Sequence, residues 1–157
     1  MNQEKINEYI ASVSAEIKHS GFAVQFVLDE EKEIHYSYTL GLSQTTPYEI
    51  IIGGFAKKTA VSILSIIIGY IKGNNITLEH ENDVNGICNV PLKLRRISNE
   101  LGCTLCSIIN VLHPDSSTID FYQLVWPDEK GVFPPHEDCT KEFADVQNLD
   151  SFVLKSK

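Results

Sequence analysis

The side chains best suited to chemistry lie in two polar and aromatic segments, and the first of these ends a predicted strand. Residues 36–42 combine aromatic rings, hydroxyl groups and a glycine, and the candidates for ligand binding among them are Tyr38, Thr39 and Gly41. Strand ends and the loops that follow them often display ligand-binding groups. Core packing of Tyr36 and Tyr38, with a turn at Gly41, is the competing interpretation, and it is the commoner role of aromatic residues in strands.

The second segment, residues 122–134, contains the only tryptophan of the chain, Trp126, beside a predicted turn. An indole can stack on a base or a sugar, and Gln123 and Asp128 could supply hydrogen bonds to the same ligand. A tryptophan that seals one edge of the core explains the sequence at least as well. The segment therefore offers three ligand-binding candidates and a structural alternative.

Basic residues offer two places for an anionic group. Lys57 and Lys58 lie at the start of a predicted helix, and the first amides of a helix can hold a phosphate. Lys93 and Arg95 are two residues apart in a predicted strand, so their side chains share one face. We take Lys57 and Arg95 as the candidates for phosphate binding, although a solvated surface is the commoner role of such pairs.

No catalytic motif accompanies these segments. The sequence has neither a G-x-S-x-G elbow nor the spacing of a phosphate-binding loop. An enzyme built on this chain, a hydrolase or a transferase, would have to use Asp128, Glu49 and His136 as acid–base groups. A third interpretation is a protein-interaction module or homo-oligomer in which both segments are structural.

Four residues could be taken for a metal site. Cys103 and Cys106 form a C-x-x-C, and His136 and Cys139 form an H-x-x-C, a ligand set suited to structural zinc. However, the first pair falls on a predicted helix beside apolar residues, where free cysteines behave as small hydrophobic side chains. We therefore expect core cysteines, with no metal and no cofactor.

Length and charge limit the class of protein. A chain of 157 residues with 43% hydrophobic residues suits one domain with a real core. The net charge of −8 argues against nonspecific binding to nucleic acid, which needs a basic face. The most apolar stretch, 60–71, is shorter than the roughly 18 residues of a membrane span. The charged residues 1–18 do not resemble a secretory signal, so we expect a soluble, cytoplasmic protein.

Hydrophobic periodicity predicts the elements that position both segments. Helical spacing predicts helices over 3–19, 56–72 and 99–111. Alternating or β-branched runs predict strands over 22–28, 34–40, 48–52, 76–80, 88–97 and 119–126, with the fifth beginning at Pro91 or lying at an edge. Short connections favour a single-domain α+β fold over 1–157, a mostly antiparallel sheet packed with two or three helices, and a loosely packed tail over 140–157.

Three motifs in this order resemble the bacterial and phage family named domain of unknown function 4262. They are Tyr38-Thr39-Leu40-Gly41-Leu42, then residues 47–54, then Gln123-Leu124-Val125-Trp126-Pro127-Asp128 followed by Gly131 and Phe133-Pro134. The chain departs from the family pattern at Tyr48, which follows the proline directly, and at Pro135-His136, where members often carry Trp-Asp. The resemblance implies a single-domain α+β protein of bacterial or phage origin, implies no activity, and suggests that the first and last motifs meet around one pocket.

The leading functional prediction is a non-enzymatic protein that binds a small, nucleotide-like molecule, such as a phage protein that sequesters a host signalling nucleotide. Aromatic, amide and hydroxyl groups without a catalytic set are typical of binding rather than turnover. Stacking would fall to Tyr38 and Trp126, hydrogen bonding to Thr39, Gln123 and Asp128, and phosphate binding to Arg95 or Lys57.

Overall fold

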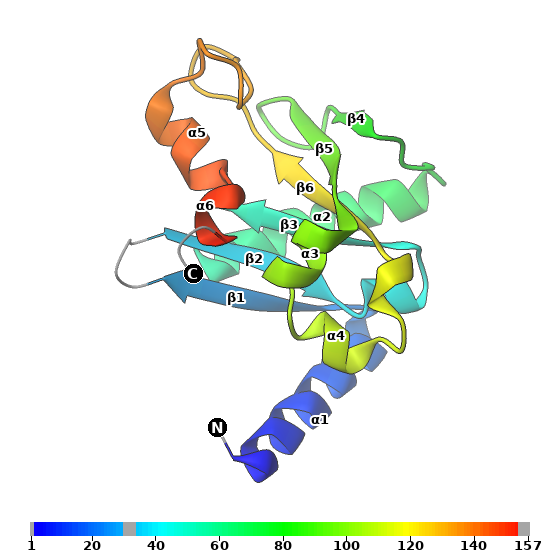
Figure 1. The fold of residues 1–157 in the computed structure, drawn as a ribbon. Helices are drawn as coiled ribbons and strands as arrows, with labels where there is room; N and C mark the ends of the chain where they lie inside the picture. Colours follow the sequence, from blue (N-terminus) through cyan, green and yellow to red (C-terminus); the bar gives the residue numbers. More distant parts are fainter. Residues whose placement is uncertain (1, 30–33, 154–157) are drawn as a thin grey trace.

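Six strands form one sheet in the order β1-β2-β3-β6-β5-β4, and helices cover both of its faces (Figure 1). The computed structural model describes residues 2–29 and 34–153. The strands are β1 (Ala23–Asp29), β2 (Ile34–Leu40), β3 (Tyr48–Gly53), β4 (Glu81–Val84), β5 (Leu92–Ile97) and β6 (Asp120–Val125). The helices are α1 (Gln3–Ser20), α2 (Lys57–Gly73), α3 (Asn99–Leu105), α4 (Ile109–Leu112), α5 (Lys141–Gln147) and α6 (Asp150–Val153).

The pairing of the strands confirms the predicted α+β fold with a mostly antiparallel sheet. Neighbouring strands run antiparallel except β3 and β6, which are parallel. β3 lies in the interior, and all of its residues are buried. Ile50 and Ile52 face the core that α2 covers, whereas Ile51 faces the core that α1, α3 and α4 cover. A strand buried on both faces needs a continuous apolar run, which is the pattern that predicted it.

The strands near the other edge differ from the prediction. The strand predicted over 76–80 is wrong, because Ile76 and Leu78 pack against the core from a loop and the polar strand β4 follows them. The strand predicted over 88–97 begins only at Leu92, directly after Pro91, whose missing amide donor favours that boundary. The connection 30–33, predicted as the hairpin loop, lies outside the described residues.

The first two helices begin and end within 1 residue of their predicted bounds. The helix predicted over 99–111 is divided into α3 and α4, because the backbone leaves helical geometry at Cys106, with φ −111° and ψ 56°. In the described part of the tail, for which the sequence predicts loose packing, Gln147 and Leu149 are buried and anchor it to the sheet. Among the described helices, none has the length and apolar content that crossing a membrane requires.

Candidate functional site

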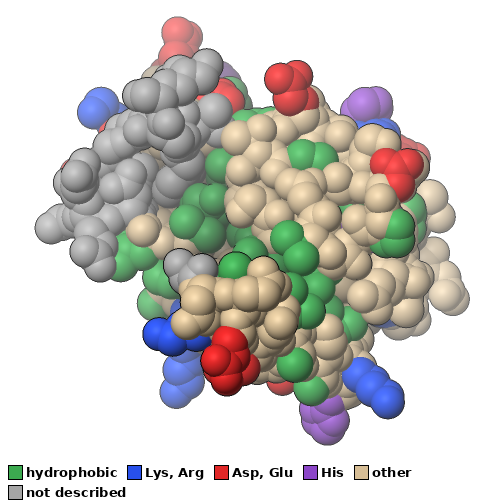
Figure 2. Space-filling view, turned by 60° about the horizontal axis from the view of Figure 1, so that its bottom comes forward, with side chains coloured by type: hydrophobic (Ala, Val, Ile, Leu, Met, Phe, Trp, Pro, Cys, Tyr) green, Lys and Arg blue, Asp and Glu red, His purple; other side chains and the backbone are tan. Residues whose placement is uncertain are grey.

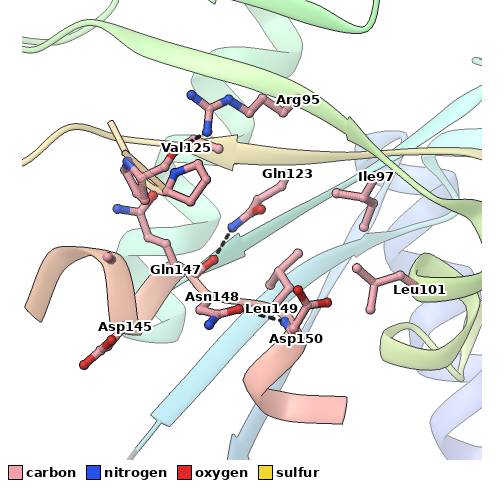
Figure 3. Close-up of a pocket in the computed structure, with 13 residues that line it drawn as sticks. Arg95, Ile97, Leu101, Gln123, Val125, Asp145, Gln147, Asn148, Leu149 and Asp150 are labelled. Carbon is pink, nitrogen blue, oxygen red and sulfur yellow. Dashed lines mark hydrogen bonds between the residues drawn. The ribbon is translucent and has the colours of Figure 1, made fainter. Parts of the chain in front are cut away.

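A cleft of about 400 Å³ lies between the sheet and the carboxyl-terminal segment (Figure 3). β5 and β6 form its floor, and α3, the end of α5 and the start of α6 form its walls. Apolar side chains make up much of the lining, among them Ile97, Leu101, Val125 and Leu149. A mostly apolar cleft with a few polar groups is the usual form of a small-molecule site.

Arg95 and Gln123 reach this cleft together because of the strand register. They are direct partners on the antiparallel strands β5 and β6. Directly opposite residues of such a pair project from the same face of the sheet, close enough to contact one ligand. The sequence predicts both as ligand-binding candidates, and the structure brings these two into one cleft.

Contacts at the rim hold the Arg95 guanidinium in place. It donates a hydrogen bond from Nη1 to the carbonyl of Pro134. Its Nε lies 3.6 Å from the carboxylate of Glu81, and its Cζ lies 6.0 Å from the centre of the Phe133 ring. A guanidinium carries five N–H donors, more than these contacts use. Arg95 is therefore a positioned cation that can still bind an anionic ligand.

Amide side chains tie the wall of the cleft to its floor. The Gln123 amide donates to the carbonyl of Gln147 at 2.5 Å. The buried Gln147 side chain in turn donates to the carbonyl of Trp126 at 2.9 Å and accepts from the Trp126 backbone amide at 2.9 Å. The Gln147 side-chain amide thus pairs with the end of β6 as a further strand would. These hydrogen bonds fix the end of α5 and the position of Asn148, the residue that follows it.

The two ends of the cleft differ in charge. Arg95 stands at one end, and Asp150 belongs to the opposite wall (Figure 3). Asp145 also belongs to the lining, but its carboxylate pairs with Lys141 at 3.1 Å and points away from Arg95 in the close-up. The arrangement suits a ligand with an anionic group at one end and an N–H donor at the other.

The two aromatic candidates lie on opposite faces of the sheet, so the suggested pocket between the two motif segments does not form. Tyr38 is 1% exposed and packs in the core beneath α1 and α3. Trp126 packs on the α2 side, with its ring centre 5.0 Å from that of Phe55 and 5.4 Å from that of Phe143. Tyr38 therefore packs in the core, and Trp126 packs at one edge of the core, as the structural interpretations of the two segments predict.

The Tyr38–Leu42 motif is held by a buried carboxylate. Glu49 accepts hydrogen bonds from the Thr39 hydroxyl at 2.6 Å, from the Leu42 amide at 3.2 Å, and from the Ser43 amide and hydroxyl at 3.1 and 2.7 Å. Burial raises the pKa of Glu49 more than these bonds lower it. Gly41 adopts φ 79°, and a Cβ there would lie 2.5 Å from Ile17. Thr39, Gly41 and Glu49 therefore shape a turn away from the cleft.

The Asp128 carboxylate, like that of Glu49, is used to bind backbone amides. Its carboxylate accepts from the amides of Lys130, Val132 and Thr140 at 2.8, 2.9 and 2.7 Å. Burial acts to raise its pKa, but the three amides together outweigh burial and lower the pKa to about 2. A carboxyl with so low a pKa stays ionised near neutral pH, so Asp128 closes the loop rather than transferring protons.

Replacement of Asp128 by Asn is expected to destabilise the fold and to change its acid dependence. The pKa falls from 3.8 to about 2 on folding, so the stabilisation is complete above pH 3.8 and is lost as the pH falls towards 2. Urea unfolding of the wild type, Asp128→Asn and the exposed control Asp138→Asn over this range measures it. If Asp128→Asn lost stability with acid as steeply as the wild type does, the assignment would be contradicted.

The remaining sequence candidates lie apart from the cleft. Lys57 lies at the start of α2, in a groove on the outer side of β1. His136 is exposed, and its Nδ1 accepts from the Asp138 amide at 3.0 Å. Glu49 lies near the start of β3 while Asp128 follows the end of β6, so the two carboxylates lie toward opposite ends of a parallel strand pair. The structure does not assemble the acid–base set of the enzyme hypothesis.

The four cysteines are free thiols. Cys106 and Cys139 are buried, and burial raises the pKa of both thiols. Across residues 2–29 and 34–153, no three His, Cys, Asp or Glu side chains come together as a metal site would require.

Residues 16–140 match the family described as Domain of unknown function (DUF4262). The chain belongs to this family. The match confirms the resemblance seen in the motifs, while no curated protein and no solved structure matches the chain. The matched region includes Arg95 and Gln123 but ends before Lys141, so the family region supplies the floor of the cleft and the tail supplies one wall.

Sequence reasoning missed the cleft residues of this tail. Gln147 is a buried amide within a polar helix, and its role depends on pairing with the end of β6, which lies about 20 residues earlier in the chain. Asn148 and Asp150 follow it in a stretch without periodicity. The local pattern gives no signal for any of the three.

Proposed function

We propose that this protein is a non-enzymatic binding protein for a small anionic molecule of the nucleotide type, held in the cleft between the sheet and α5–α6. The observation that carries the proposal is the placement of Arg95 opposite Gln123 at that cleft. Its volume of about 400 Å³ lies within the range of about 300–1,000 Å³ typical of small-molecule sites.

The lining accounts for each part of such a ligand. A phosphate or carboxylate group binds the Arg95 guanidinium, which can form two parallel hydrogen bonds with it. The Asn148 amide hydrogen-bonds to polar atoms of the ligand, and an amino group donates to Asp150. Ile97 and Leu149 cover the apolar faces of a ring. In this proposal the ring is held by aliphatic side chains, whereas the sequence predicts stacking on Tyr38 and Trp126.

Binding rather than turnover is favoured by the use of the buried carboxylates. Glu49 and Asp128 accept hydrogen bonds from backbone groups outside the cleft, so neither faces a ligand bound there. Sequestration of a host signalling nucleotide by a phage protein requires only binding of this kind, and we include that role in the proposal. A cytoplasmic location is part of it too, because free thiols suit a reducing compartment.

A thermal-shift panel tests the proposal. The purified full chain is heated with nucleoside mono-, di- and triphosphates, cyclic mono- and dinucleotides, and inorganic phosphate. A ligand at about 100 times its Kd adds roughly 2.7 kcal/mol to the free energy of unfolding, so the melting temperature rises. We expect at least one nucleotide to raise it and to be recovered chemically unchanged. A flat panel contradicts binding, and conversion of the nucleotide contradicts the non-enzymatic assignment.

A further inference from the structure

The outer strand β1 presents an open edge of the sheet. Within the described residues no strand pairs with its outer side. The direction of its backbone groups follows from β2. The carbonyl of His35 accepts from the Gly54 amide at 3.1 Å, so His35 faces β3. Because the N–H and C=O of one residue in an antiparallel strand point the same way and alternate along the chain, Tyr36 and Tyr38 must face β1.

This alternation fixes which residues of β1 are unpaired in the ladder. Val27 and Gln25 are the partners of Tyr36 and Tyr38, and they use their backbone groups within the sheet. Val24 and Phe26 therefore direct their N–H and C=O groups outward, where an added strand could pair with them. The Gln25 side chain donates to the Phe26 carbonyl at 3.1 Å, which covers one outward acceptor in the unbound protein.

Helices flank this edge on both faces of the sheet. A groove of about 920 Å³ has β1 as its floor, α1 as one wall and α2 as the other. Figure 2 shows the side of the molecule on which α1 and β1 lie, with hydrophobic side chains gathered across its middle. A single extended chain fits between the two walls. A second copy of the sheet would bring its own α1 and α2 against the same helices, which disfavours pairing of two copies.

The two walls have opposite charges. The α1 wall carries Glu16 near the helix carboxyl end, where the helix dipole is negative. The basic residues of that last turn, Lys18 and His19, do not belong to the groove lining. The α2 wall carries Lys57 at the helix amino end, where the dipole is positive. Each wall therefore attracts the charge opposite to its own.

We propose that the edge of β1 binds an extended segment of a partner protein by β-strand addition, and that this segment carries neighbouring basic and acidic residues. Successive side chains of a strand point to opposite faces, so the basic one meets Glu16 and the acidic one meets Lys57. The outward N–H and C=O groups of Val24 and Phe26 supply the main-chain hydrogen bonds. β1 and the cleft floor lie in different parts of the strand order, so this surface is independent of the proposed ligand site.

The test selects a bead-displayed library of short random peptides on the full chain and then titrates the enriched peptides by fluorescence anisotropy. Val24→Pro removes an N–H donor that points outward and leaves every hydrogen bond of the sheet intact. Edge strands tolerate proline at such positions. The matched control is Asp83→Pro on the other edge strand. There the His80 carbonyl accepts from the Arg96 amide at 2.8 Å, so Asp83 also faces outward. We expect Val24→Pro to weaken binding roughly tenfold or more and Asp83→Pro to leave it unchanged.

Hydrogen exchange of the wild type gives a second measurement that needs no variant. Peptide binding should slow exchange of the Val24 and Phe26 amides and leave the already paired Gln25 amide unchanged. The proposal is overturned by equal affinity of the two proline variants, by a library without enrichment of neighbouring basic and acidic residues, or by unchanged exchange at Val24. It is also overturned if the wild type is a dimer that Val24→Pro dissociates, since a second copy would then occupy the edge.

Discussion

Replacement of Glu49 by Ala is expected to lower the free energy of unfolding by about 3–5 kcal/mol, because several buried donors lose their acceptor and each costs about 1–3 kcal/mol when left unpaired. Glu49 is fully buried, and its carboxylate accepts from Thr39, Leu42 and Ser43. Part of the turn can rehydrate after the change, so the total is smaller than the sum of the separate losses. Urea unfolding followed by circular dichroism measures it.

The matched control for this variant is Glu8→Ala, a carboxylate exposed on α1. Exposed substitutions of this kind usually change stability by less than about 0.5 kcal/mol. Glu49→Gln should fall between the two, because its amide oxygen still accepts while its NH₂ group meets donors. Equal stability of Glu49→Ala and Glu8→Ala would show that the buried carboxylate does not hold the 39–43 turn.

Replacement of Gly102 by Ala is expected to destabilise the protein by about 3 kcal/mol, the upper end of the usual cost of overpacking a core. Gly102 is buried within α3, directly over the ring of Phe121 on β6. A Cβ there would lie 2.2 Å from the ring carbons Cγ and Cδ2. Since Phe121 is itself fully buried, the ring has no room to retreat.

The same substitution elsewhere should have the opposite sign. Gly69 lies within α2, and no described atom is within 4 Å of a Cβ built there. Gly69→Ala should therefore stabilise the protein by about 0.5–1 kcal/mol, the difference between these residues in a helix. The double variant Gly102→Ala with Phe121→Leu should recover part of the lost stability. Thermal unfolding of the wild type and these three variants measures the differences. A Gly102→Ala variant more stable than the wild type would contradict the close packing of Gly102 on the Phe121 ring.

Most of the fold could be predicted because its elements carry their own periodicity. The run over 48–52 has no polar alternation, which indicates burial on both faces, and β3 has that burial. The start of β5 followed from Pro91, since a proline cannot donate to a ladder. β4 was missed because a short polar edge strand has neither a hydrophobic pattern nor enriched strand-forming residues.

The site was predicted only in part, for a physical reason. Alternation assigns side chains to faces within one strand, but it does not say which faces of different strands coincide. Arg95 and Gln123 coincide through the β5–β6 register, whereas Tyr38 and Trp126 fall on opposite faces. The roles of Asp128 and Glu49 depend on backbone amides brought close by folding, which residue types alone do not reveal.

The ligand site at the Arg95–Gln123 cleft is tested most directly by calorimetric titration with the nucleotide that gives the largest thermal shift. The titration compares the wild type, Arg95→Gln and Lys93→Gln. Both variants remove one positive charge from the same face of β5, but only Arg95 lines the cleft. We expect Arg95→Gln to weaken binding by roughly tenfold or more, about 1.4 kcal/mol per tenfold change, and Lys93→Gln to bind as the wild type does. Equal affinities for the two variants would contradict a ligand site at the Arg95–Gln123 cleft.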